Sequence, residues 1–248
     1  MSLSYGPSEM MAVAMARLIR DGELVFIGVN SPLPLVAASL ARRLHAPNST
    51  LLSIGGGINP NPAALGAATS SAKLSIGSAS VFDNVDFYGL VARGGVDATF
   101  LGFAQLDERG QVNSSFIGEQ KRPTVRFPGG GGAATILPLS RRVILWRASH
   151  SPRIFVKEVP FVTSAGNVDR VVTPLCTFRK EGDHLVLDSI HSYTARERLA
   201  KSTGFAIRNL DQAPVTPPPT TAELSELNRL DPEGVRRSEF PSGDLSAV

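Results

Sequence analysis

Two glycine-rich segments are the parts of the sequence best suited to approach a ligand closely. Phe127–Thr135 contains four consecutive glycines, Gly129–Gly132, and Ser53–Pro62 contains the run Gly55–Gly57. Because glycine has no side chain, such a backbone can come close to a ligand and point several N–H groups at one anion. Each run is equally compatible with a flexible turn that only needs positive φ angles. The sequence therefore offers two candidate anion-binding loops and leaves the turn interpretation open for both.

The titratable side chains form no recognisable catalytic set. The four histidines are isolated from one another in the sequence: His45, His150, His184 and His191. The single cysteine, Cys176, lies in the apolar segment VVTPLCTF, which is more typical of a core residue than of a nucleophile. There is no HExxH zinc motif, no P-loop GxxxxGK[ST] and no recognisable Ser-His-Asp motif. We therefore expect no metal site, and we look to a partner chain for an acid or base.

In the first half of the chain, predicted strands alternate with predicted helices. Helices are expected over 8–20, 33–44 and 82–92, and strands over 23–29, 49–54, 72–78 and 96–107, the strand 72–78 being weak. This alternation predicts an α/β fold, an open, mostly parallel sheet with helices on both faces. Ligands of such sheets bind at the carboxyl ends of the strands. Both glycine runs follow strand-like segments, so their positions favour a site.

The second half of the chain predicts further strands and a separate tail. Strands are expected over 143–148, 153–163, 170–178 and 184–190, followed by a helix over 194–205 that begins at a capping Thr194 and ends at Gly204. The proline-rich residues 214–219 predict an extended linker, and 221–230 a short helix. We therefore divide the chain into one α/β domain, 1–211, and a linker with a C-terminal helix, 212–248.

Composition limits the classes of partner. The 248 residues are 42% hydrophobic and 19% charged, with a net charge of only +3 and one cysteine. Arginines are spread along the chain and no nucleic-acid-binding motif is present, so we expect no nucleic-acid partner. No apolar run approaches the roughly 18 residues of a membrane span, and the first residues lack a signal-peptide pattern. We expect a soluble, cytoplasmic protein that does not bind a membrane.

The segment around the four glycines resembles the β-type subunit of family I CoA-transferases. The resemblance rests on a run of matching motifs: Gln105-Leu106-Asp107, Gly110-Gln111-Val112-Asn113, Arg122-Pro123-Thr124-Val125-Arg126-Phe127-Pro128 and Gly129–Ala133. A weaker likeness covers Pro7 to about Val162, and the closing segment ELNRLDPEGVR also looks like this family's tail. The resemblance implies the CoA-transferase fold, an α-type subunit as obligate partner in a heterodimer or heterotetramer, and an acyl-CoA thioester as substrate. Coenzyme A would enter only as part of that substrate, with no permanently bound cofactor.

One departure from the family pattern concerns the nucleophile. The family's transferases carry a glutamate in a strand-to-loop motif E-x-G, and its carboxylate attacks the thioester. Aligning LLSIGGGI on this motif places Ile54 at the glutamate, and a shift by one residue gives Ser53 or Gly55. No register restores a carboxylate, so covalent acyl-anhydride chemistry is not expected. The chain in this respect looks like CoA-transferase-like enzymes that lack the glutamate, the actinobacterial steroid-ring-opening hydrolase and the myxobacterial methylglutaconyl-CoA decarboxylase. The decarboxylase has a cysteine at the position of Ile54, so its reaction does not transfer directly.

These considerations define a set of expected contacts and three functions. Backbone contacts to the thioester oxygen or acyl carboxylate are expected from Gly55, Gly56, Gly57, Gly129, Gly130, Gly131, Gly132 and Ala133. Side-chain contacts are expected from Asn30, Ser31, Ser78, Gln105 and Asn113, for each of which a structural turn is an equal alternative. The first function is a decarboxylase or C–C hydrolase acting on an acyl-CoA. The alternatives are a true CoA-transferase with a displaced nucleophile and a non-catalytic binding subunit. The sequence determines neither the acyl group nor the catalytic acid or base.

Overall fold

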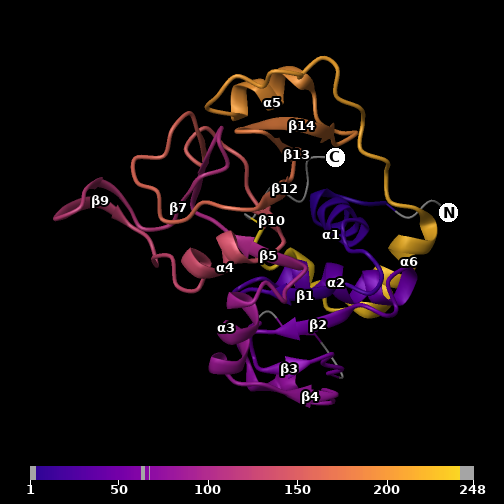
Figure 1. The fold of residues 1–248 in the computed structure, drawn as a ribbon. Helices are drawn as coiled ribbons and strands as arrows, with labels where there is room; N and C mark the ends of the chain where they lie inside the picture. The colour runs from indigo at the N-terminus through magenta and orange to yellow at the C-terminus, as the bar shows by residue number, and fades with distance from the viewer. Residues whose placement is uncertain (1–3, 63–64, 67, 241–248) are drawn as a thin grey trace.

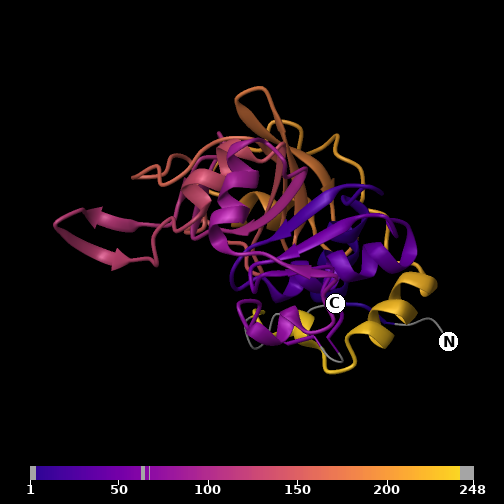
Figure 2. The ribbon, with the colours of Figure 1, turned by 60° about the horizontal axis from the view of Figure 1, so that its bottom comes forward.

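The protein is built around one large sheet that separates two layers of helices (Figures 1 and 2). The computed structural model describes residues 4–62, 65–66 and 68–240. The sheet has nine strands in the order β14-β13-β12-β10-β5-β1-β2-β3-β4. Within the described ranges, no helix is both long enough and apolar enough to cross a membrane.

The five central strands of the sheet are parallel, and the strands at both edges are antiparallel. The central strands are β1 (Leu24–Ile27), β2 (Thr50–Ser53), β5 (Ala98–Gly102), β10 (Arg142–Trp146) and β12 (Val168–Val172). The edge strands are β3 (Gly57–Ile58), β4 (Ser80–Val81), β13 (Cys176–Glu181) and β14 (His184–Ile190). Buried strands of this kind are nearly continuous apolar runs, as LVFI and RVILW illustrate. The predicted α/β class with a mostly parallel sheet is confirmed.

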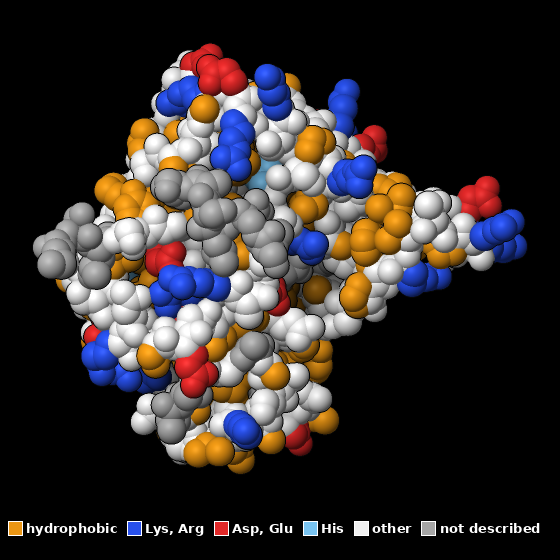
Figure 3. All heavy atoms as spheres, turned by 180° about the vertical axis from the view of Figure 1, so that it is seen from behind, with side chains coloured by type: hydrophobic (Ala, Val, Ile, Leu, Met, Phe, Trp, Pro, Cys, Tyr) orange, Lys and Arg blue, Asp and Glu red, His pale blue; other side chains and the backbone are white. Residues whose placement is uncertain are grey.

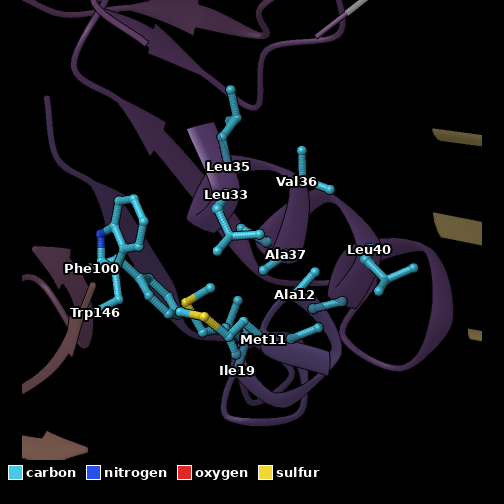
Figure 4. Close-up of a cluster of buried hydrophobic side chains, with 14 of the residues drawn as sticks. Met11, Ala12, Ile19, Leu33, Leu35, Val36, Ala37, Leu40, Phe100 and Trp146 are labelled. Carbon is cyan, nitrogen blue, oxygen red and sulfur yellow. The ribbon is translucent and has the colours of Figure 1, made fainter. Parts of the chain in front are cut away.

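Alternate residues of the strands enter two hydrophobic cores, one on each face of the sheet. On one face, α1 (Pro7–Arg17) and α2 (Pro32–Leu44) cover a core that includes Phe100 and Trp146 (Figure 4). On the other face, α3 (Asn84–Ala92) and α4 (Ala133–Leu139) pack with Phe26 and Leu145. The C-terminal helix α6 (Thr221–Leu230) packs against α2 from outside. It therefore forms a third layer on the α1–α2 side.

The remaining elements are short and lie beside the main sheet. A three-stranded sheet combines β6 (Gln105–Asp107), β7 (Val112–Asn113) and β11 (Phe155–Val156). A two-stranded arm, β8 (Phe116–Glu119) and β9 (Arg122–Arg126), projects from the body in both ribbon views (Figures 1 and 2). The other short helices are α5 (Arg196–Ser202) and two 3-10 turns, η1 (Ala72–Ser75) and η2 (Val235–Arg237).

Two strand predictions in the first half are wrong. Within the segment 72–78, Ala72–Ser75 form the 3-10 turn η1, because the Ser71 hydroxyl accepts a hydrogen bond from the backbone N–H of Lys73 and starts a helical turn. The segment 96–107 is divided, since β5 ends at Gly102 and β6 joins the small sheet instead. The helix predicted over 82–92 begins later, at Asn84, because the Asp83 carboxylate caps it.

Three predictions in the second half are also wrong. Of 153–163 only Phe155–Val156 is a strand, and the segment continues as a loop whose end bonds to Val112. The segment 170–178 is a hairpin, because the Thr173 hydroxyl accepts the N–H groups of Leu175 and Cys176 and folds the chain back. Thr194 does not cap α5; Ala195 precedes the helix, and the Thr194 hydroxyl has no hydrogen-bond partner in the described structure.

A buried ion-pair cluster joins the N-terminal helix to the C-terminal tail. The carboxylate of Glu9, in α1, accepts hydrogen bonds from Arg236 Nε at 2.9 Å and Arg237 Nη2 at 2.7 Å. Arg236 also bonds the Asp231 carboxylate at 3.0 Å, and its side chain is only 4% exposed. Burial raises the pKa of Glu9, but the hydrogen bonds from Arg237 and Arg236 outweigh burial and lower the pKa to about 2. The folded state thus favours the charged carboxylate.

This cluster predicts a pH-dependent contribution to stability. The folded pKa of Glu9 is lower than its ordinary value of 4.5, so the stabilisation is complete above pH 4.5 and is lost as the pH falls towards 2. Glu9→Gln should reduce the free energy of unfolding at pH 7 by roughly 3 kcal/mol. Urea unfolding of wild type and variant between pH 7 and pH 3 should show this difference narrowing below pH 4.5.

Glu226→Gln is the matched control, because Glu226 pairs with a solvent-exposed arginine, Arg229, on the surface of α6. Its effect should be much smaller than that of Glu9→Gln. An equal loss of stability in both variants, or a Glu9→Gln effect that does not depend on pH, would contradict the assignment.

Candidate active site

A large cleft opens where the parallel strands end. It has a volume of about 710 Å³ and is bounded by the loops after β1, β5 and β10 and by the glycine loop before α4. Its lining comprises Phe26, Gly28, Val29, Asn30, Ile54, Tyr88, Leu101, Gly102, Phe103, Ala104, Ser114, Pro128–Ala133, Ile136, Trp146–Ser149 and Glu239. On the face seen in Figure 3, the surface is hollowed next to the base of the β8–β9 arm, and basic and acidic side chains are interspersed. The position agrees with the crevice expected for an open α/β sheet.

The glycine loop forms one wall of the cleft and presents free backbone donors. Gly129 has φ +97° and donates its N–H to Ser114 O at 2.7 Å, which fixes the loop against the start of the arm. The N–H groups of Gly130, Gly131 and Gly132 have no hydrogen-bond partner among the described residues. Three free donors at a cleft wall are a suitable arrangement for binding a carbonyl or carboxylate oxygen.

The glycines of this loop differ in the space around them. A Cβ on Gly131, at φ +48°, would meet no atom within 4 Å, so a side chain there would extend into open space. A Cβ on Gly132 would lie 2.3 Å from the Tyr88 hydroxyl, and one on Gly130 would lie 2.8 Å from Thr163 Cγ2. Gly130 and Gly132 are therefore required for packing of the loop, whereas Gly131 is free to face a ligand.

The second glycine run forms a tight turn and does not line the cleft. Gly56 has φ +88° and donates its N–H to Ser53 O, which reverses the chain between β2 and β3. A Cβ on Gly57 would lie 2.4 Å from the Ser78 hydroxyl oxygen. The residues Gly55, Gly56, Gly57 and Ser78 are all outside the cleft lining. Their geometry is that of a turn, which the sequence left open as the alternative to an anion-binding loop.

Ile54 and Asn30 reach the cleft from the ends of two neighbouring strands. β2 ends at Ser53, so Ile54 is the first residue beyond it, and its partly buried side chain packs against the core beneath α3 and α4. Asn30 follows β1 with φ +49°, a left-handed conformation that asparagine tolerates better than most residues. Ser31 is buried and donates its hydroxyl to Val29 O, outside the cleft lining.

Gln105 and Asn113 form a buried network beneath the arm. Asn113 Nδ2 donates to Gln105 Oε1 at 2.9 Å and to Phe116 O at 2.8 Å, while Gln105 Nε2 donates to Arg153 O. Asn113 Oδ1 accepts the N–H of Ser115 at 3.0 Å. Neither side chain lines the cleft. Their hydrogen bonds hold β6, β7 and the first strand of the arm together. Any effect of these two side chains on the glycine loop is therefore indirect.

The cleft residues outside the set expected from the sequence include Trp146, Arg147, Ser149 and Glu239. The first three follow from the end of the apolar strand RVILW, because residues just beyond a central parallel strand face the crevice. No local signal in the sequence indicates Glu239, which the C-terminal tail brings to the cleft after η2.

His150, His191 and Cys176 lie in surroundings that are typical of structural residues, not of catalytic ones. His191 is fully buried between the Thr216 hydroxyl and Thr173 O, and burial lowers its pKa to about 4. His150 bonds two threonine hydroxyls, and burial lowers its pKa to about 3. Burial raises the pKa of the Cys176 thiol far above its ordinary value, which disfavours the nucleophilic thiolate. None of these side chains lines the cleft.

Comparison with known proteins agrees with this architecture. Residues 8–195 match the family described as "Coenzyme A transferase". The β-type subunit of the 3-oxoadipate CoA-transferase of Pseudomonas knackmussii is 32% identical over 92% of this chain and 94% of its own. The cholesterol ring-cleaving hydrolase IpdB subunit of Mycobacterium tuberculosis is 28% identical over 95% of this chain and 98% of its own. A chain in the crystal structure of the decarboxylase AibA/AibB superposes with a TM-score of 0.90 and 29% identity, covering 96% of this chain and 100% of that one. The resemblance found in the sequence is confirmed: the chain belongs to the coenzyme A transferase family, as a subunit of the β type.

Proposed function

We propose that this chain is the β-type subunit of a two-subunit enzyme that converts an acyl-CoA thioester bound in the cleft, without forming an acyl-glutamate intermediate. The observation that carries the proposal is Ile54. It lines the cleft, and its side chain has no nucleophilic atom. The alignment of LLSIGGGI on the family's E-x-G motif puts Ile54 in place of the glutamate. The reaction is then decarboxylation or C–C hydrolysis of the acyl group, which is supported by the likeness to the decarboxylase AibA/AibB and to the ring-cleaving hydrolase IpdB.

A second candidate is CoA transfer with a nucleophile elsewhere. It is supported by the 3-oxoadipate CoA-transferase relative, which shares 32% identity over nearly the whole chain. This alternative requires another carboxylate beside the thioester. The third expectation, a binding subunit without catalysis, has no specific observation in its favour.

In the proposed mechanism the cleft holds the thioester through its backbone. The free N–H groups of Gly130–Gly132 would donate to the carbonyl oxygen, which gains negative charge when the acyl group is cleaved or loses CO₂. The apolar walls formed by Phe26, Leu101 and Ile136 would exclude water and strengthen these hydrogen bonds. Coenzyme A takes part as a component of the substrate, and the cytoplasm is the proposed location.

The cleft is open on one side, and the proposed α-type partner would close it. We expect the chain expressed alone to aggregate or remain inactive, because an open crevice with exposed apolar residues such as Val29 is typical of an unpaired interface. Co-expression with its α-type subunit should give a monodisperse complex that turns over acyl-CoA. Size-exclusion chromatography with light scattering, combined with an acyl-CoA assay, tests this. A monodisperse and fully active preparation of this chain alone would refute the partnership.

Gly131 provides a test of the backbone-binding role. Gly131→Val places a side chain in the open space of the cleft and should reduce acyl-CoA turnover about 100-fold or more if an oxyanion donor is lost. Gly132→Val is a poorer test because it also displaces Tyr88. Gly182→Val is the matched control, since Gly182 also has positive φ and open surroundings but lies in the β13–β14 turn. Equal kinetics for the two folded variants would favour a simple turn.

Ile54 provides a test of the covalent intermediate. After incubation of the complex with acyl-CoA and treatment with hydroxylamine or borohydride, the mass of this chain should be unchanged, because no anhydride forms. Ile54→Glu should not restore CoA transfer, since the side chain packs against apolar core and an unpaired carboxylate there would be protonated. A trapped adduct on any carboxylate of this chain, together with CoA transfer to a free acid, would establish the second candidate instead.

A further inference from the structure

Glu239 is the only carboxylate among the described residues that line the cleft. It does not come from the strand ends that form the rest of the site. The chain passes through α6 and η2, which both pack against α2, and then brings Glu239 into the cleft lining. A tail that brings a charged side chain to an otherwise mainly apolar cleft suggests a use for that charge.

The backbone on both sides of Glu239 is fixed to the body of the protein. On one side, Arg236 bonds Glu9 at 2.9 Å and Asp231 at 3.0 Å, in the buried cluster described above. On the other side, Phe240 is 7% exposed and packs in the same core as Trp146 and Ala148. Because these anchors lie three residues before and one residue after it, the backbone of Glu239 has a defined place at the cleft.

Two donors of the cleft wall complement this carboxylate. The Arg147 guanidinium, whose Nη1 donates to Phe103 O at 2.7 Å, lies within electrostatic range of Glu239. The indole Nε1–H of Trp146, a residue that is 2% exposed, has no hydrogen-bond partner in the described structure. A buried unpaired donor in a cleft wall is expected to bind an acceptor brought by a ligand or an ordered water. The cleft thus combines a carboxylate, a cation and free N–H donors.

We propose that Glu239 is the general base of the cleft and removes a proton from the carbon next to the thioester carbonyl of a bound acyl-CoA. In this step the C–H bond breaks, its electron pair forms the enolate, and negative charge moves onto the carbonyl oxygen. The proton forms an O–H bond on the Glu239 carboxylate, and the free N–H groups of the glycine loop stabilise the oxygen. The reverse step returns a proton to the carbon, as protonation after loss of CO₂ or after C–C cleavage requires.

The surroundings of Glu239 suit this role. Partial desolvation raises the pKa of its carboxyl group, and the charge of Arg147 limits that increase. A carboxylate with a raised pKa is a stronger base than a fully hydrated one. The Glu239 side chain is also exposed to solvent in this chain, so its carboxylate is accessible to a bound molecule.

The test is deuterium exchange by the complete two-subunit enzyme. This inference rests on the proposed function, so binding and exchange are measured separately on the same preparations. Acetyl-CoA, butyryl-CoA and glutaryl-CoA serve as probes in D₂O, with mass spectrometry of the recovered thioester and calorimetry of binding. Wild-type enzyme should incorporate deuterium at the carbon next to the carbonyl of at least one probe. Glu239→Gln should slow this exchange about 100-fold or more with little change in affinity, and Glu239→Asp should restore part of it.

Glu233→Gln is the matched control, because Glu233 is an exposed glutamate of the same tail outside the cleft lining. It should exchange at the wild-type rate. Binding without exchange in the wild type, or exchange by Glu239→Gln within about threefold of wild type, would overturn the role of Glu239 and leave the proposed function standing. Failure of all three probes to bind would overturn the proposed function and this inference together.

Discussion

The shared direction of the five central strands is the constraint on which the site depends. Parallel strands end at the same edge of a sheet, so the residues after β1, β2, β5 and β10 meet there. The chain passes from β1 to β2 on one side and later returns to place β5 on the other side of β1. The loops leaving β1 and β5 therefore diverge in opposite directions, and a crevice opens between them. The glycine loop and the tail only complete a hollow that the sheet topology has already produced.

The opposite edge of the sheet is closed by ion pairs. Arg142, at the start of β10, bonds the Glu23 carboxylate at 2.7 Å and that of Asp169 at 2.9 Å. These contacts join the amino ends of β1, β10 and β12, and burial of the guanidinium is compensated because both partners are charged. The sheet is thus pinned at the edge away from the cleft, while the cleft edge retains free backbone donors. The amino ends of the strands therefore contribute to stability, and the carboxyl ends form the ligand cleft.

The sequence predicted the elements whose signals are local. The strands formed by the apolar runs before Gly28 and Gly55 and the helix over 221–230 are all found as expected. The apolar residues of 153–163 and 170–178 predict single strands. These predictions fail because apolar residues also suit loops and hairpins that pack on a core. Their shape depends on contacts such as that of the Thr173 hydroxyl, which composition does not reveal.

The site residues that could be predicted are those in the loops that follow predicted strands. Asn30, Ile54 and Gly130–Ala133 line the cleft, as the strand-to-loop positions indicated. Gln105 and Asn113 belong to the same sequence motif as the glycines but lie in the scaffold beneath them, because a motif also records residues needed for folding. Glu239 comes from a tail distant in the sequence, and only its tertiary path brings it to the cleft. Whether the lining residues contact a substrate stays a prediction.

A crystal structure of the two-subunit complex with a non-hydrolysable acyl-CoA analogue tests the central claim most directly. The account predicts that the carbonyl oxygen of the analogue lies about 2.7–3.1 Å from a backbone nitrogen of Gly130–Gly132. It further predicts that the acyl group contacts the Ile54 side chain with no carboxylate of this chain in position to attack the carbonyl carbon. An analogue bound away from the cleft, or a glutamate or aspartate of this chain aligned on that carbon, would contradict it.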